Sequence, residues 1–267
     1  MEELKKRAKE VKIIFFDIDD TLRIKDTGFM PDSVNLAFDK LRKKGILTGI
    51  ATGRNLSGVV PEVRALNPDF YVTANGAYIV NSSGEVVYDN PYSPELAQDL
   101  VDWLKSVDSE YVFYGNNELA ISKWGDLERD AMQIIYGDLK VDPDFNKSNS
   151  VYQILSLSDH DEDLVLPEKF TDKVRRVRWH LNSCDIVPIN GNKREGCKIV
   201  LDKLGLPLES MMNFGDGPND LELVDLPGLF VAMEISDDQV LKQADYVTKK
   251  VEEDGVHKAL VELGIIE

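Results

Sequence analysis

The segment VKIIFFDIDDTL, residues 11–22, limits the possible folds more than any other stretch of the chain. Its first six residues are apolar except for one lysine, and Asp17, Asp19 and Asp20 follow within four positions. An apolar run of this kind is typical of a strand buried in a parallel sheet, and such sheets bind ligands at the carboxyl ends of their strands. Three carboxylates this close repel one another, which favours a site for a cation or a substrate. The alternative is an acidic helix cap in which Asp20 or Thr21 accepts backbone N–H bonds.

The order of predicted elements extends this strand into a sheet. A helix with an acidic start and a basic end is predicted for residues 32–44, and a glycine follows it. Apolar strands are predicted at 46–51 and 70–74, with a helical segment between them. After residue 193 the alternation resumes, with strands at 211–214, 229–232 and 246–248. This order predicts an α/β protein with a Rossmann-like parallel-sheet core and right-handed crossovers.

A segment of different character interrupts this alternation. Asn81-Ser-Ser-Gly84 lies between two apolar runs and indicates a β-hairpin, so antiparallel pairing is expected there. Further strands follow, with helices expected near 94–107, 127–136 and 162–170. We therefore predict an inserted α+β domain at residues 77–187 and a core made of residues 1–76 and 188–267.

The charge balance disfavours two classes of partner. The 267 residues include 31 basic and 48 acidic ones, a formal net charge of −17, and residues 77–187 alone carry 10 basic and 21 acidic residues. Such a surface repels nucleic acid and anionic membranes at long range, so we expect neither as a partner. Any phosphate that binds here has to be attracted locally.

Cysteine content and hydropathy indicate the compartment. Cys184 and Cys197 are the only cysteines, too few for a disulfide framework, and the first ten residues lack the apolar core of a signal peptide. No apolar run approaches the roughly 18 to 20 residues that span a bilayer. We expect a cytoplasmic protein that is a monomer or a weak homodimer.

Polar loops follow the first two predicted core strands. Asp17 and Asp19 are two residues apart, so their side chains point the same way if strand geometry continues through them. Thr52 and Gly53 follow the second strand and offer a hydroxyl and an unhindered backbone N–H, which suit an anionic oxygen.

Two more polar segments belong to the second part of the core. Lys193 lies at the start of a predicted helix and provides a point charge that can neutralise phosphate. Asp216, Asn219 and Asp220 follow a strand and add carboxylate and amide oxygens to a cation site. Because one sheet brings such loops to the same edge, we expect the four segments to form one site.

These motifs occur in the order D-I-D-D-T-L, A-T-G-R, N-G-A, Lys193 and G-D-G-P-N-D. In this order they resemble the haloacid dehalogenase superfamily. The long insert between the Asn75-Gly76-Ala77 loop and Lys193 resembles the Cof-type, type IIB capped phosphatases of that superfamily. Within the insert the resemblance is one of position, size and α+β character, because no motif occurs there.

The resemblance implies a covalent mechanism and a metal. Asp17 is then the nucleophile that forms an aspartyl-phosphate, and Asp19 is the acid/base that protonates the leaving alcohol and activates water. The carboxylates of Asp17 and Asp216 and the backbone carbonyl of Asp19 would hold Mg²⁺. The implied phosphate-binding groups are Thr52, the Gly53 backbone, Lys193 and Asn219. Asp220 would orient Lys193 or metal-bound water.

Two basic segments have alternative interpretations. Arg54 is as well placed to pair with a core carboxylate as to contact a ligand. On the predicted strand at 174–181, one face carries Arg176, Arg178 and His180, while the other carries Val177, Trp179 and Leu181. The basic face is either a solvated face of the inserted domain or a surface that selects an anionic or hydroxylated leaving group.

We therefore expect a Mg²⁺-dependent phosphatase that hydrolyses small phosphomonoesters, with sugar phosphates as the leading class. The insert would act as a cap with hinges near residues 77–78 and 188–192. A phosphotransferase or mutase is the alternative enzyme, and a metabolite-binding regulator without turnover is the alternative from another class. An acid at position 19 argues against a regulator, because a binding module has no use for an acid/base.

Overall fold

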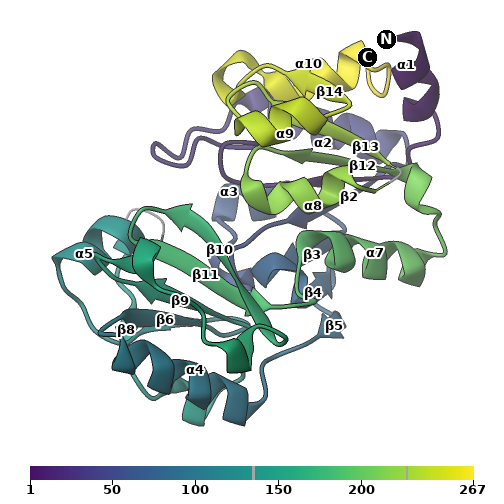
Figure 1. Cartoon of the computed structure of the whole chain (residues 1–267). Coiled ribbons are helices and arrows are strands. Elements are labelled where there is room, and N and C mark those ends of the chain that lie inside the picture. The colour runs from purple at the N-terminus through teal and green to yellow at the C-terminus, as the bar shows by residue number, and fades with distance from the viewer. Residues whose placement is uncertain (134–135, 227) are drawn as a thin grey trace.

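The computed structural model describes residues 1–133, 136–226 and 228–267. The chain forms two lobes (Figure 1), which we call the core and the cap. The core holds both termini, and the cap is built from the middle of the chain. The chain enters the cap after residue 89 and leaves it before residue 193.

The core contains an eight-stranded sheet in the order β14-β13-β12-β1-β2-β3-β4-β5. β1 pairs in parallel with both β2 and β12, so Phe16 lies beside Ile50 on one side and Phe214 on the other. The order of the strands reverses at β1, which brings the loops after β1, β2 and β12 together at one edge of the sheet. The strands are β1 (Ile13–Phe16), β2 (Leu47–Ala51), β3 (Phe70–Thr73), β4 (Tyr78–Asn81), β5 (Val86–Asp89), β12 (Met211–Gly215), β13 (Leu229–Met233) and β14 (Tyr246–Thr248).

Helices cover both faces of this sheet (Figure 1). Successive side chains of β1 point to opposite faces: Phe16 packs on Phe38 of α2, with ring centroids 4.9 Å apart, while Phe15 joins the cluster that contains Val200 of α7. All four residues of β1 are buried, which explains its continuous apolar sequence. The core helices are α1 (Glu2–Ala8), α2 (Asp32–Lys43), α3 (Pro61–Ala65), α7 (Lys193–Leu204), α8 (Leu221–Val224), α9 (Asp238–Gln243) and α10 (Gly255–Glu262).

The cap is a six-stranded sheet in the order β10-β11-β9-β6-β7-β8. Helix α4 (Pro94–Ser106) begins at Ser93, whose side chain accepts a bond from the Leu96 N–H, and packs Leu100 and Leu104 against one face of the sheet. On the other face, Tyr114 belongs to a separate apolar cluster and reaches the space between the lobes. The strands are β6 (Glu110–Tyr114), β7 (Leu119–Ile121), β8 (Lys140–Val141), β9 (Gln153–Leu157), β10 (Val174–His180) and β11 (Ser183–Pro188).

The hairpin β4–β5 joins the core sheet, which differs from the expected start of the insert at residue 77. Asn75 and Gly76 have φ values of 51° and 92°, and this left-handed turn reverses the chain so that Tyr78 pairs antiparallel with Thr73. The turn signal at 81–84 correctly predicted a hairpin, but a local signal does not specify which sheet the hairpin joins. With β4 and β5 on the core side, we propose residues 90–192 as the insert in place of 77–187.

Two helices of the cap also differ from expectation. The helix predicted at 127–136 includes residues 134–135, which lie outside the described residues; before them, α5 (Asp126–Glu128) continues into a π-helical turn at Arg129–Gln133. The segment 162–170 forms two 3₁₀ turns, Asp161–Asp163 and Glu168–Phe170, rather than one helix. Pro167 lies between them and cannot donate the backbone bond that a continuous helix needs.

Candidate active site

Lys193 joins two loops that are far apart in the sequence. Its Nζ lies 2.7 Å from Oδ1 of Asp17 and 2.7 Å from Oδ1 of Asp220, and its side chain has no exposed surface. Burial lowers the pKa of Lys193, but the two carboxylates raise it more, so it lies above its ordinary value. The ammonium therefore stays charged and fixed between the two acids.

The start of α7 places Lys193 at the edge of the sheet. Asn192 is the N-cap residue, and its Oδ1 accepts a 2.7 Å bond from the Glu195 N–H. One turn later, a Cβ atom on Gly196 would lie only 2.9 Å from Cα of Gly76 and 2.5 Å from Cγ1 of Val72. Glycine is therefore required for this close approach between α7 and the loop after β3.

Asp220 is held by the loop that it belongs to. Its Oδ2 accepts the backbone N–H groups of Asp216 and Gly217, each at 3.1 Å, while its Oδ1 accepts from Lys193. A Cβ atom on Gly215 would lie 2.4 Å from Cγ of Asp220, so this approach also needs glycine. Asp220 thus fixes both the loop after β12 and the ammonium of Lys193.

The carboxylates around Lys193 have the properties of a cation site. Oxygens of Asp17, Asp216 and Asp220 lie within 4.8 Å of one another, and the Thr21 hydroxyl donates to Oδ1 of Asp216 at 3.1 Å. Burial raises the pKa of Asp17 to about 7, against the opposing effect of Lys193, and desolvation raises the pKa of Asp216 well above its ordinary value. A divalent cation would offset this cost of ionisation, and hard carboxylate oxygens are the ligands that Mg²⁺ prefers. These residues therefore fit a magnesium site.

Asp19 forms a bidentate pair with Arg54. Nε of Arg54 lies 2.7 Å from Oδ2 of Asp19, and its Nη2 lies 2.8 Å from Oδ1. The guanidinium also donates to the Gly58 carbonyl at 3.0 Å and lies 5.5 Å from the ring centroid of Tyr136 in the cap. Of the two roles considered for Arg54, the structure shows the pairing with a core carboxylate.

The second loop lies beside the fourth. The hydroxyl of Thr52 accepts the Arg54 N–H at 3.1 Å, and Thr52 is buried. A Cβ atom on Gly53 would lie 3.3 Å from Oδ1 of Asn75 and 3.6 Å from Nδ2 of Asn219. The two amides are joined by a 3.3 Å bond from Asn219 Nδ2 to Asn75 Oδ1. Thr52, Gly53 and Asn219 thus meet at the same sheet edge as Asp17 and Lys193.

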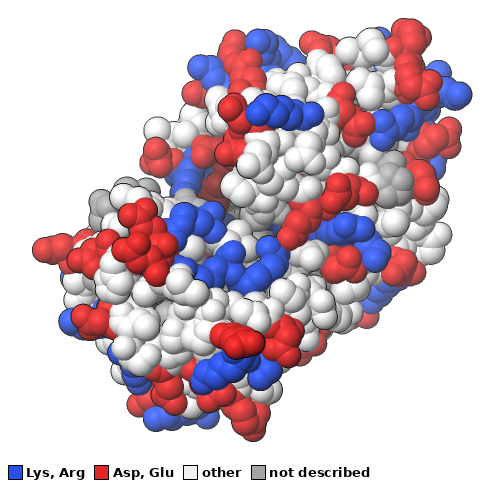
Figure 2. All heavy atoms as spheres, in the orientation of Figure 1, with Lys and Arg blue, Asp and Glu red and all other residues white. Residues whose placement is uncertain are grey.

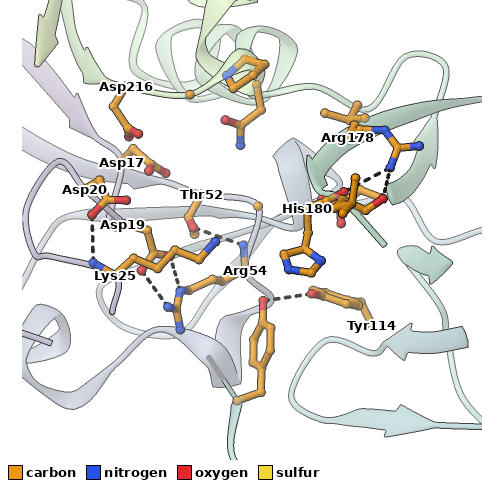
Figure 3. A pocket seen from close by; sticks show the side chains of 18 residues that line it. Asp17, Asp19, Asp20, Lys25, Thr52, Arg54, Tyr114, Arg178, His180 and Asp216 are labelled. Carbon is orange, nitrogen blue, oxygen red and sulfur yellow. Dashed lines mark hydrogen bonds and ion pairs between the residues drawn. The ribbon is translucent and has the colours of Figure 1, made fainter. Parts of the chain in front are cut away.

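A cavity of about 510 Å³ lies between the lobes, over this edge of the sheet. Figure 2 shows the hollow, with basic side chains along the edge of the cap that faces it. In Figure 3, Asp17, Asp19, Asp20 and Asp216 lie on one side of the cavity and His180, Tyr114 and Arg178 on the other. The lining residues are Asp17, Asp19, Asp20, Lys25, Thr52, Gly53, Arg54, Asp216, Gly217, Pro218 and Asn219 from the core, and Tyr114, Tyr136, Val177, Arg178, His180, Leu181 and Asp185 from the cap.

The three cap residues predicted to select the substrate have different positions. Arg178 and His180 line the cavity, but Arg176 does not: its Nη2 pairs with the buried carboxylate of Asp161 at 2.6 Å. The expected separation of faces is also wrong, because Val177 lines the cavity as well. The pairing of β10 with β11 shifts register between Arg178 and His180, and such a bulge breaks the alternation of side chains that a regular strand would have.

Several side chains of the cavity have no signal in the sequence. Lys25 belongs to the loop after β1, and Tyr114, Tyr136 and Asp185 come from cap segments without a recognisable motif. Asn75, from the N-G-A motif of the sequence, does not line the cavity but lies next to it, because its amide contacts both Asn219 and Asp185. The side chain of Asn75 donates to Gln153 Oε1 at 2.9 Å and to Asp185 Oδ2 at 3.3 Å, so it joins core to cap.

Comparison with known proteins agrees with this fold and site. Residues 14–260 match the haloacid dehalogenase-like hydrolase family. A putative bifunctional phosphatase/peptidyl-prolyl cis-trans isomerase of Streptococcus pyogenes serotype M6 is 42% identical over 99% of this chain, and the alignment covers 56% of that protein. The chain thus spans little more than half the length of this relative. The putative phosphatase YkrA of Bacillus subtilis is 30% identical, over 96% of this chain and 98% of its own.

Solved structures of similar proteins have the same fold. A protein from Geobacillus kaustophilus HTA426 superposes with a TM-score of 0.83 at 31% identity, over 96% of this chain and all of its own. The subclass IIB sugar phosphatase BT4131 also gives a TM-score of 0.83, at 27% identity and with the same coverage. The chain therefore belongs to the haloacid dehalogenase-like hydrolases and has their fold in its capped, subclass IIB form. Among the described residues, no helix is both long and apolar enough to cross a membrane.

Proposed function

We propose that this hydrolase is a Mg²⁺-dependent phosphatase that cleaves small phosphomonoesters through an aspartyl-phosphate on Asp17. The observation that carries the proposal is the position of Lys193, 2.7 Å from both Asp17 and Asp220 and buried beside Asp216. A buried ammonium next to a row of acids suits a site where an anionic phosphoryl group and a cation bind together.

Asp17 is the proposed nucleophile. Its carboxylate lies at the end of β1, at the bottom of the cavity, and Lys193 holds one of its oxygens. Attack on phosphorus forms the Asp17–phosphorus bond while the bond to the leaving oxygen breaks. Lys193, Thr52, the Gly53 backbone and Asn219 would surround the phosphoryl oxygens, on which negative charge is spread during transfer.

Asp19 is the proposed acid/base. It would give a proton to the leaving oxygen and then take one from the water that hydrolyses the aspartyl-phosphate. In the structure both of its oxygens are bound by Arg54, which also contacts Tyr136 of the cap. Release of one oxygen from Arg54 would make Asp19 available to the leaving group, and a shift of the cap toward or away from the core would influence this step.

The carboxylates of Asp17 and Asp216 and the backbone carbonyl of Asp19 would hold Mg²⁺. When bound, the ion neutralises phosphoryl charge and favours the ionised form of the carboxylates around it. The hydroxyl of Thr21 and the backbone around Asp220 orient the acids that would bind it.

Sugar phosphates are the proposed leading substrates, in a cytoplasmic enzyme. BT4131 is named a sugar phosphatase, and a 26% identical protein of B. subtilis is named a 5-amino-6-(5-phospho-D-ribitylamino)uracil phosphatase. The roofed cavity of about 510 Å³ suits leaving groups of this size and excludes a folded macromolecule.

The test is release of inorganic phosphate from a panel of sugar, nucleotide and cofactor-precursor monophosphates, with Mg²⁺ and with a chelator. We expect release with Mg²⁺ and loss of nearly all of it with the chelator, reversed by added Mg²⁺. Phosphate release from no compound would refute the proposal. Turnover that requires an added acceptor alcohol would identify a phosphotransferase instead.

A further inference from the structure

Asp185 contributes a carboxyl group from the cap to the wall of the cavity. It lies on β11, is 8% exposed, and is the one carboxylate of the cap among the described residues that line the cavity. A carboxylate is costly to bury, so its position at this wall requires partners that hold it. One partner is Asn75 of the core, whose Nδ2 donates to Asp185 Oδ2 at 3.3 Å.

Asn75 links this carboxylate to the phosphate-binding loops. Its Oδ1 accepts from Asn219, and its Nδ2 also donates to Gln153, which has no exposed surface. The backbone at Ala74, Asn75 and Gly76 is left-handed, with φ values of 48°, 51° and 92°, so the turn holds the amide in one direction. Asp185 is therefore held two hydrogen bonds away from Asn219, on the cap side of the phosphoryl position.

Arg178, the basic residue of the cap wall, is largely committed to the cap itself. Its Nη1 donates to the carbonyls of His180 and Leu181, and its Nη2 contacts the backbone oxygen and the carboxylate of Asp161. Figure 3 shows the guanidinium turned toward these backbone oxygens. Arg178 thus shapes the end of the β10–β11 hairpin, and its donors are directed away from a leaving group.

His180 and two uncharged phenols are further polar groups of the cap wall. The hydroxyls of Tyr114 and Tyr136 are 2.9 Å apart, and both residues line the cavity. Burial raises the pKa of Tyr136 to about 12 and that of Tyr114 well above its ordinary value, so both stay protonated. Phenolic hydroxyls bind the hydroxyl groups of a ligand as donors and acceptors.

We propose that Asp185 is a specificity-determining residue that admits leaving groups with uncharged hydrogen-bond donors, such as hydroxyls, and excludes those with a second anionic group. A carboxylate only accepts hydrogen bonds, so it favours donors, and its charge repels a carboxylate or a second phosphate that binds close to it. This inference rests on the proposed phosphatase function and narrows its substrates to neutral polyols that carry a single phosphate.

The test compares two substrates that differ by one charge. Glucose 6-phosphate and 6-phosphogluconate have the same carbon number, but the second carries a carboxylate at C1. We expect kcat/KM of the native enzyme to favour the neutral sugar by at least tenfold, and Asp185→Asn to reduce this preference to about twofold. The change should appear mainly in KM, as a gain for the charged substrate, while hydrolysis of p-nitrophenyl phosphate changes little.

Asp172→Asn is the matched control, because it removes one charge from an exposed position of the cap outside the cavity. It should leave the ratio of the two substrates unchanged. A native preference for 6-phosphogluconate would overturn the proposal and point to recognition of the second anion by a cation of the cavity such as Lys25. An equal loss of both activities in Asp185→Asn would overturn it as well, because Asp185 would then act on structure and not on selectivity.

Binding separates this proposal from the phosphatase function itself. If the native enzyme hydrolyses neither compound nor p-nitrophenyl phosphate, the phosphatase function fails, and calorimetric titration of the two compounds into Asp17→Asn still measures selectivity. Tighter binding of glucose 6-phosphate, with the difference reduced when Asp185→Asn is added, supports the role of Asp185. Equal affinities overturn it.

Discussion

The core and the cap use their charged residues in different ways. In the core, Lys193 joins Asp17 to Asp220 across 176 and 27 residues of sequence, and the carboxylates around it face a cavity. In the cap, Arg176 and Arg178 both pair with one buried carboxylate, Asp161, within the same lobe. The core keeps a surplus of acid at a site that a cation can enter, whereas these two arginines of the cap are paired within their own lobe.

This difference has a physical origin. Phosphoryl transfer demands particular residue types at particular positions, so the core loops have recognisable motifs. A cap has to enclose a cavity and present a wall, and many sequences can do so. We therefore expect changes in the core to abolish the reaction, changes in the cap to alter stability or selectivity, and changes at their contact to have intermediate effects.

The largest effect is expected for Asp17→Asn. The amide keeps the shape of the side chain but removes the nucleophile, so kcat should fall by at least about 10³-fold. The far-ultraviolet circular dichroism spectrum and the melting temperature should stay close to those of the native protein, because the Lys193–Asp220 pair remains. Phosphate release with p-nitrophenyl phosphate measures the loss.

Asp20→Asn is the control for this variant, since it removes a carboxylate from the same sheet edge. Asp20 accepts the Lys25 N–H at 3.0 Å and has a φ of 56°, a conformation that asparagine tolerates. We expect kcat within about fivefold of native. Similar losses in Asp17→Asn and Asp20→Asn would contradict the assignment of the nucleophile.

The next prediction concerns the contribution of the cap arginines to stability. Arg176→Ala leaves the fully buried carboxylate of Asp161 with one cation in place of two, so the free energy of unfolding should fall by about 3 kcal/mol. Urea denaturation measures this change. Substrate preference should not change, because Arg176 lies outside the cavity.

Lys173→Ala is the comparison for Arg176→Ala, because Lys173 is exposed just before β10. Its free energy of unfolding should stay within about 0.5 kcal/mol of native. A change of selectivity in Arg176→Ala with little loss of stability would show that the basic face of β10 does read the substrate.

The same contrast explains how much of the molecule could be predicted from its sequence. The strand at β1, its acidic end and the alternation of strands and helices are local patterns, and they correctly predicted the α/β core. Asp17, Asp216, Lys193 and Asp220 were predicted to meet because parallel strands end at one edge, and the structure brings them together. Their catalytic roles stay predictions.

The parts that were missed depend on long-range pairing. A hairpin pattern at β4–β5 does not reveal that Tyr78 pairs with Thr73 of the core sheet. The bulge between Arg178 and His180 has no sequence signal either, and it decides which side chains of β10 reach the cavity. Asp185 was overlooked because a single acid on a predicted strand is usually exposed to solvent, and the sequence does not show that this part of the cap faces the core.

The contact between the lobes is tested by reversing one hydrogen bond. In the native protein, Asn75 Nδ2 lies 3.3 Å from Asp185 Oδ2. Asn75→Asp replaces this donor with a second carboxylate, and because the two carboxylates repel each other, kcat/KM should fall by about 10- to 100-fold. In the double variant Asn75→Asp/Asp185→Asn, the amide at position 185 can donate to the new carboxylate. Gln153 can also turn its Nε2, which has no partner in the described part of the chain, toward position 75.

We expect the double variant to recover at least about tenfold of the loss, a coupling of roughly 1.4 kcal/mol or more. The measurement is a double-mutant cycle on kcat/KM with p-nitrophenyl phosphate, a substrate without a second charge. Asp185→Asn alone provides the fourth corner of the cycle. Additive losses in the double variant would mean that Asn75 and Asp185 do not act through their shared bond.

The smallest effect is expected at the rim, where Arg175 of β10 pairs with Glu222 of α8 at 2.8 Å across the two lobes. Both side chains are 28% exposed, so the pair contributes about 0.2–1 kcal/mol to cap closure, and Arg175→Gln should raise KM by no more than about fivefold. At 1 M salt the Debye length is about 3 Å, so the native enzyme should lose most of this contribution and match the variant. Lys249→Gln breaks an exposed pair with Glu234 in which both residues belong to the core lobe. This control should leave KM unchanged at either salt concentration. A salt-independent rise in KM for Arg175→Gln would mean that Arg175 acts by packing rather than by charge, and the electrostatic contact between core and cap would then be confined to the buried bond at Asn75.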